Sequence, residues 1–178
     1  MKNISLANML KNEGPLSLEI AWHWFRGMLV HLNEIHQSHQ THGDIKPENI
    51  VLLERGEVKM EGVVPNSKPG FASGTTLYMA PELLTSATGG PESDIYALGV
   101  VFYECLSGRK PHEFSRPDEP LIEFADRLVH EDAPLLSTHI EVPNKVDVMV
   151  GKMLARQPRQ RYRKMKKLLS DFDKIKTA

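Results

Sequence analysis

A run of nine residues constrains this chain more than any other feature. The run is HGDIKPENI, from His42 to Ile50, and it places an acid, a lysine and an amide at fixed offsets. Asp44 can accept a proton from a hydroxyl group, Lys46 can steady a phosphate and Asn49 can hold a Mg²⁺ ion. These residue types at this spacing predict a loop built for phosphoryl transfer.

Length and composition indicate one domain in a reducing compartment. A chain of 178 residues can bury a sizeable core, so residues 1–178 are predicted to form a single domain. The formal net charge of −1 gives no overall attraction to nucleic acid or to an anionic membrane, and neither is expected as a partner. One cysteine, Cys105, leaves no disulfide framework and favours the cytoplasm, with the nucleus as the alternative.

Hydrophobic periodicity predicts a mainly helical chain with one small β-hairpin. Ser17 is a helix N-cap, and the helix after it is expected to run to about Ser38. Its buried face is expected to contain Ile20, Trp24, Met28, Leu32 and Ile35, widened by Phe25 and Leu29. Residues 50–53 and 57–60 are predicted strands, and further helices are predicted near 94–106, 119–130, 144–156 and 162–175.

Three further motifs follow the loop in order. They are GTTLYMAPELL from Gly74 to Leu84, SDIYALG from Ser93 to Gly99, and RQPRQRY, which contains Arg161. With the loop, they resemble the C-terminal lobe of a eukaryotic-type serine/threonine protein kinase across nearly the whole chain. The resemblance implies a mainly α fold, a helical bundle with the small hairpin beside the catalytic loop.

The resemblance also implies roles for the residues of the loop and its surroundings. Asp44 and Lys46 would be catalytic, and Asn49 would bind Mg²⁺. Thr75 would bond near Asp44 and Lys46 and favour serine or threonine as the phosphate acceptor.

Four other residues would be structural. By the same resemblance, His42 would pack under the loop and Asp94 would accept hydrogen bonds from backbone N–H groups of the loop. Glu82 would pair with Arg161, because a buried charge that loses its partner costs about 3–5 kcal/mol.

The gravest departure from the family pattern lies just after the second strand. VKMEGVV, from Val58 to Val64, stands where Val-Lys-Leu-x-Asp-Phe-Gly is expected, so Gly62 replaces the principal metal-binding aspartate. Glycine has no side chain to bind a metal. Glu61 could substitute only if the backbone bulges, because neighbouring strand residues point to opposite faces.

The sequence also has no Gly-rich nucleotide-binding motif. None of the twelve glycines forms GxGxxG, and the chain begins at what resembles the hinge and the first helix of the C-terminal lobe, so we expect the N-terminal lobe to be absent. No cofactor is therefore expected for these 178 residues; ATP and Mg²⁺ are expected only if a nucleotide-binding half lies outside them.

Three functions remain open at the level of sequence. The favoured one is a pseudokinase, a kinase-like module that binds a protein partner such as another kinase's lobe or the rest of a longer protein. The alternative is the C-terminal part of an active ATP-dependent serine/threonine kinase whose other lobe lies outside this chain. The third is a non-productive fragment, which would not unfold cooperatively.

A basic segment stands apart from the motifs. Between Lys152 and Lys167 there are eight basic residues and no acidic ones. Such a run could bind an acidic partner or a nucleic-acid backbone, although a solvated helix face is the simpler interpretation.

Overall fold

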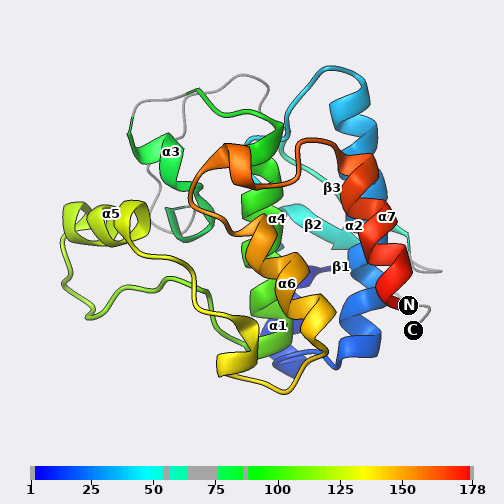
Figure 1. The fold of residues 1–178 in the computed structure, drawn as a ribbon. Coiled ribbons are helices and arrows are strands. Elements are labelled where there is room, and N and C mark those ends of the chain that lie inside the picture. Colours follow the sequence, from blue (N-terminus) through cyan, green and yellow to red (C-terminus); the bar gives the residue numbers. More distant parts are fainter. Residues whose placement is uncertain (1–2, 54–56, 64–75, 86–87, 177–178) are drawn as a thin grey trace.

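The chain is mainly helical, with one small antiparallel sheet beside the helices (Figure 1). A computed structural model describes residues 3–53, 57–63, 76–85 and 88–176. The predicted fold class is confirmed, including a hairpin that continues directly from the loop. Thr75 lies outside the described residues, so its predicted role stays a prediction.

The predicted helices are present, with small shifts at their ends. Ser17 caps the long helix α2 by accepting a hydrogen bond from Ile20 N, 3.4 Å from its Oγ. None of the described helices is both long and apolar enough to cross a lipid bilayer. The helices are α1 (Leu6–Glu13), α2 (Leu18–Gln37), α3 (Pro81–Leu84), α4 (Pro91–Ser107), α5 (Leu121–His130), α6 (Asn144–Met153) and α7 (Met165–Lys176), with 3₁₀ turns η1 (Pro47–Asn49), η3 (Thr76–Tyr78), η4 (Leu136–Thr138) and η5 (Pro158–Gln160).

The sheet has three strands in the order β1-β2-β3. Strands β2 (Ile50–Leu52) and β3 (Val58–Met60) form the predicted hairpin, with Ile50 opposite Met60. Strand β1 (Ile4–Ser5) pairs antiparallel with β2 and was not predicted, because two residues are too few to show an alternating pattern. Since β2 begins where η1 ends, the hairpin holds the end of the loop in place.

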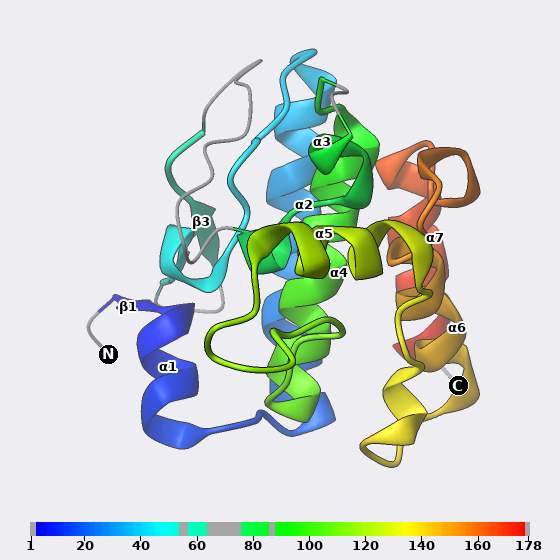
Figure 2. The ribbon, with the colours of Figure 1, turned by 90° about the vertical axis from the view of Figure 1, so that its left-hand side faces the viewer.

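Helix α4 forms the centre of the core. In Figure 2 it runs down the middle with α2 behind it, while α6 and α7 lie on one side and α1 with the sheet on the other. Phe102 of α4 stacks on Phe25 of α2, with ring centroids 3.9 Å apart, and Trp22 stacks on Phe172 of α7 at 4.0 Å.

The buried face of α2 agrees with the predicted one at Phe25, Met28, Leu29 and Leu32 and differs from it in the first two turns. Ile20 is 42% exposed and Trp24 only partly buried, whereas Trp22 is buried with Phe25, Met28, Leu29 and Leu32. Apolar residues surround much of this helix, so periodicity alone did not fix the face. Packing against Phe102 and Phe172 selects the side that carries Trp22.

The approach of α6 to α4 depends on Gly99. A Cβ atom built on Gly99 would lie 3.0 Å from Met153 Cβ and 3.1 Å from Leu154 Cδ2. These contacts are tighter than packed carbon atoms usually show, so a methyl group here would force Met153 or Leu154 to shift.

We predict opposite effects for two Gly→Ala substitutions. Gly99→Ala should lower the free energy of unfolding by about 1–3 kcal/mol because it overpacks the α4–α6 contact. Gly151→Ala should raise it by about 0.5–1 kcal/mol, since a Cβ there meets nothing closer than Leu135 Cδ2 at 3.8 Å and alanine favours the helix. Urea unfolding of both variants measures this, and a stable Gly99→Ala would contradict the packing argument.

Candidate functional site

Three polar side chains of the predicted loop contact one another. Lys46 Nζ lies 2.8 Å from Asp44 Oδ2, and Asn49 Nδ2 donates to the same oxygen at 2.8 Å. Asn49 Nδ2 also donates to the backbone oxygen of Asp44 at 2.8 Å. The Asp44 carboxylate is thus held by two donors and is about a quarter exposed, so it can meet a molecule that approaches the loop.

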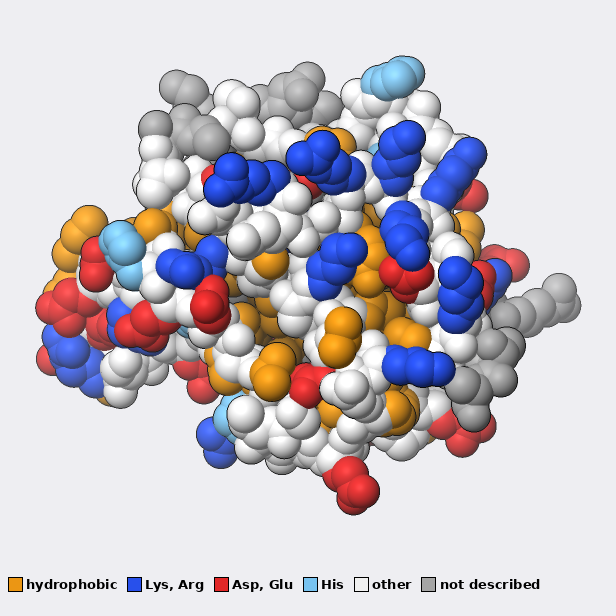
Figure 3. Space-filling model, viewed as in Figure 1, with side chains coloured by type: hydrophobic (Ala, Val, Ile, Leu, Met, Phe, Trp, Pro, Cys, Tyr) orange, Lys and Arg blue, Asp and Glu red, His pale blue; other side chains and the backbone are white. Residues whose placement is uncertain are grey.

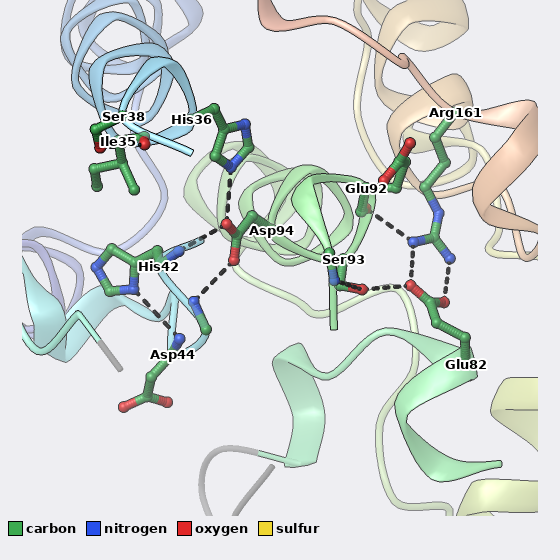
Figure 4. Close-up of polar contacts among 12 residues, drawn as sticks. Ile35, His36, Ser38, His42, Asp44, Glu82, Glu92, Ser93, Asp94 and Arg161 are labelled. Carbon is green, nitrogen blue, oxygen red and sulfur yellow. Dashed lines mark hydrogen bonds and ion pairs between the residues drawn. The ribbon is translucent and has the colours of Figure 1, made fainter. Parts of the chain in front are cut away.

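Asp94 fixes the backbone that precedes these residues. Its carboxylate accepts hydrogen bonds from His42 N at 2.8 Å and from Gly43 N at 2.9 Å, as the resemblance implied. Figure 4 shows His36, from the last turn of α2, reaching the same carboxylate through Nε2 at 2.8 Å. Asp94 lies in the first turn of α4, where the helix dipole favours a negative charge.

The ring of His42 is completely buried beneath the loop. Its Nδ1 accepts a hydrogen bond from Asp44 N at 3.3 Å, so this nitrogen carries no proton. Burial lowers the pKa of His42, and the nearby carboxylates of Asp94 and Asp44 oppose the shift without cancelling it. A neutral His42 therefore supports the backbone at Asp44.

Glu82 and Arg161 form a buried ion pair between α3 and the residue after η5. The guanidinium binds both carboxylate oxygens, at 2.8 and 2.7 Å (Figure 4). Its remaining N–H groups donate to the backbone oxygens of Ala155, Glu92 and Arg156. All five donors of Arg161 are thus satisfied, and Ser93 Oγ adds a 2.7 Å hydrogen bond to Glu82.

Gly62 faces Asn49 directly. A Cβ atom at Gly62 would lie 3.2 Å from Asn49 Nδ2 and 3.6 Å from Asn49 Oδ1. Its φ of +72° belongs to the left-handed region that glycine adopts most readily. The residue that stands at the expected aspartate therefore borders the amide predicted to bind metal, and it contributes no ligand.

Glu61 does not take the place of the missing acid in this structure. Its carboxylate lies 2.9 Å from Lys59 Nζ and is about half exposed, while its backbone N donates to Asn49 O at 2.7 Å. Among the described residues, no group of three His, Cys, Asp or Glu side chains gathers around a possible metal. Mg²⁺ is usually held by one or two carboxylates together with waters and substrate phosphates, and neither Gly62 nor Glu61 places a carboxylate beside Asn49 in this structure.

Sequence reasoning missed two features beside the loop. The first is His36, whose contact with Asp94 depends on where α2 ends. The second is a pocket of about 360 Å³ lined in part by Pro47 and Glu48. Within it, Glu104 accepts 2.6 Å hydrogen bonds from Tyr78 Oη and Lys110 Nζ. Both features join residues far apart in the sequence, so no local pattern reveals them.

Comparison with known proteins agrees with the geometry. A family model described as a protein kinase domain matches residues 1–172. The chain is 32% identical over 166 residues to the serine/threonine-protein kinase drp72 of Corynebacterium efficiens, and 30% identical over 167 residues to the serine/threonine-protein kinase PknL of Mycobacterium tuberculosis. Each alignment covers 89% of this chain, which spans only 31% and 41% of the length of those relatives.

We predict that the Glu82–Arg161 pair is essential to the fold. Arg161→Met should lower the free energy of unfolding by about 3–5 kcal/mol, because it leaves Glu82 without its partner in a largely buried site. Arg163→Met, at an exposed position two residues away, should change it by less than about 0.5 kcal/mol. Equal effects of the two changes in urea unfolding would contradict this assignment.

We also predict a loss of stability in mild acid that depends on His42. Because the pKa of His42 is lowered in the folded chain, the unfolded chain binds more protons once the pH falls below its unfolded pKa of about 6.5. The free energy of unfolding should therefore decrease as the pH falls through this value. His42→Gln should make this decrease smaller, as measured by urea unfolding between about pH 7.5 and 5.5. Part of the decrease should remain, because burial also lowers the pKa of His112.

Proposed function

This chain belongs to the eukaryotic-type serine/threonine protein kinase family, and we propose that it acts there as a pseudokinase that binds a protein partner. The proposal concerns these 178 residues, in which the scaffold contacts are complete and the metal site is not. Active members of the family use ATP and Mg²⁺. The compartment we propose is the cytoplasm or the nucleus.

The contact between Gly62 and Asn49 carries the proposal. Phosphoryl transfer relies on positioned positive charge that stabilises the reacting oxygens, and metal ions supply much of that charge. With glycine beside Asn49 and Glu61 paired to Lys59, neither residue supplies the carboxylate that would hold a metal ion there. Lys46 and Asn49 instead contact Asp44, so the loop polar groups satisfy one another.

The intact scaffold supports a binding role over loss of function. Arg161 makes five hydrogen bonds, and Asp94 accepts hydrogen bonds from the backbone of the loop. Both residues therefore hold the surface around them in a fixed shape. A fixed surface lowers the entropy cost of binding a partner. The partner we propose is another kinase's lobe or the rest of a longer protein. Three residues after β3, the apolar side chain of Val63 is 38% exposed and available to that partner.

We predict that restoring the carboxylate restores metal binding. In Gly62→Asp, a carboxylate would stand beside Asn49, so Mg²⁺ should raise the melting temperature of the variant and leave that of the wild type unchanged. Gly62→Asn is the matched control, because asparagine must adopt the same left-handed backbone as aspartate but carries no charge. Thermal unfolding with and without Mg²⁺ and ATP measures the effect.

The opposite outcome would establish the active-kinase alternative, which the clustering of Asp44, Lys46 and Asn49 favours. Its signs are Mg²⁺-dependent ATP binding by the wild type and phosphate transfer from labelled ATP by the longest native form, lost in Asp44→Asn. A divalent cation between Glu61 and Asn49 in a crystal grown with nucleotide would support the same alternative.

A further inference from the structure

Basic side chains gather on one face of the molecule, around the segment that joins η5 to α7 (Figure 3). We define the basic surface as Arg159, Arg163, Lys164 and Lys166, all of which are exposed. The surrounding stretch from residue 148 to residue 170 contains no acidic residue. The charge is therefore concentrated, although the chain as a whole carries a net charge of −1.

The other basic residues of this segment have structural partners. Arg156 lies 2.6 Å from Asp132, Lys167 lies 2.6 Å from Asp171, and Arg161 is bound to Glu82. Lys152 Nζ lies over the Tyr162 ring, 4.3 Å from its centroid. The basic surface has no such neutralisation. Within the described parts of the chain no carboxylate lies within ion-pair distance of its four side chains, and Arg159 bonds only the neutral Gln157, at 2.7 Å.

Two of these lysines, Lys164 and Lys166, lie where their charge destabilises helix α7. Lys164 immediately precedes the helix and Lys166 is its second residue, and the first turn contains no acidic residue. Helix N-termini carry positive partial charge and are stabilised by acids, so lysines there are unfavourable to folding. The fold gains nothing from this arrangement, and an anionic partner would relieve it.

We propose that the basic surface binds an acidic segment of a partner protein. Stacking of nucleic-acid bases requires exposed aromatic rings, and the only aromatic residue between 148 and 170 is Tyr162, which is 3% exposed. Firm membrane binding uses apolar side chains inserted beside the charges, and the exposed large hydrophobic residue described in this stretch, Val148, lies on α6 and not among the four basic residues. Runs of aspartate and glutamate need neither feature, because carboxylates pair with guanidinium and ammonium groups directly.

This inference does not depend on the proposed function. The basic surface contains no residue of the loop from 42 to 49, so an acidic segment would bind whether or not the chain transfers phosphate. The probe is a fluorescein-labelled polyglutamate peptide of about ten residues, followed by fluorescence anisotropy with the full chain. Affinity should fall steeply as salt rises from about 50 to 300 mM, since exposed charges are screened.

Charge reversal tests the location. Lys164→Glu with Lys166→Glu should weaken peptide binding about tenfold or more. The melting temperature of this double variant should stay the same or rise, because acids favour a helix N-terminus, so unfolding cannot explain the loss. Lys11→Glu with Lys145→Glu, at two exposed lysines outside the basic surface, gives the same net charge and should weaken binding much less.

Three outcomes would overturn the proposal. One is the absence of peptide binding at low salt, and another is an equal loss of affinity in the two double variants. The third is that an oligothymidine of equal charge, or phosphatidylserine vesicles, bind more tightly than the polyglutamate peptide and lose that binding in the Lys164→Glu with Lys166→Glu variant. That result would assign the basic surface to nucleic acid or to membrane instead.

Discussion

The first turn of α4 is the junction on which both halves of the site depend. Asp94 binds the backbone at His42 and Gly43, and the adjacent Ser93 binds Glu82 in its ion pair with Arg161. Two irregular segments, neither of which can satisfy its polar groups in a regular ladder, are thereby attached to the most deeply buried helix. The geometry of the loop is thus a consequence of where α4 begins.

The scaffold and the chemistry of the site are separable in this chain. The contacts of Asp94, of Arg161 and of His42 Nδ1 are made with protein atoms alone, so they persist whether or not a metal binds. Metal affinity instead depends on a few oxygen ligands at fixed distances, and one side chain decides it. The family resemblance therefore establishes the architecture, while Gly62 beside Asn49 bears on the activity.

The charged side chains also fall into two groups, those paired within the fold and those exposed on the basic surface. The Glu82 carboxylate is paired directly with the Arg161 guanidinium, whose side chain is fully buried. The four side chains of the basic surface have no carboxylate within ion-pair distance among the described residues, and they act through a field that reaches about 8 Å in physiological salt. The first kind maintains the fold, and the second is available to a partner.

The sequence by itself determined the fold class, the long helix capped by Ser17, the hairpin and the identity of the loop, because caps, periodicity and motif spacing are local. It also placed Gly62 at the missing acid. Only the tertiary structure decided which face of α2 is buried, that His36 reaches Asp94 and that Glu61 pairs with Lys59. Those choices depend on side chains packed from distant segments, and no spacing along the chain encodes them.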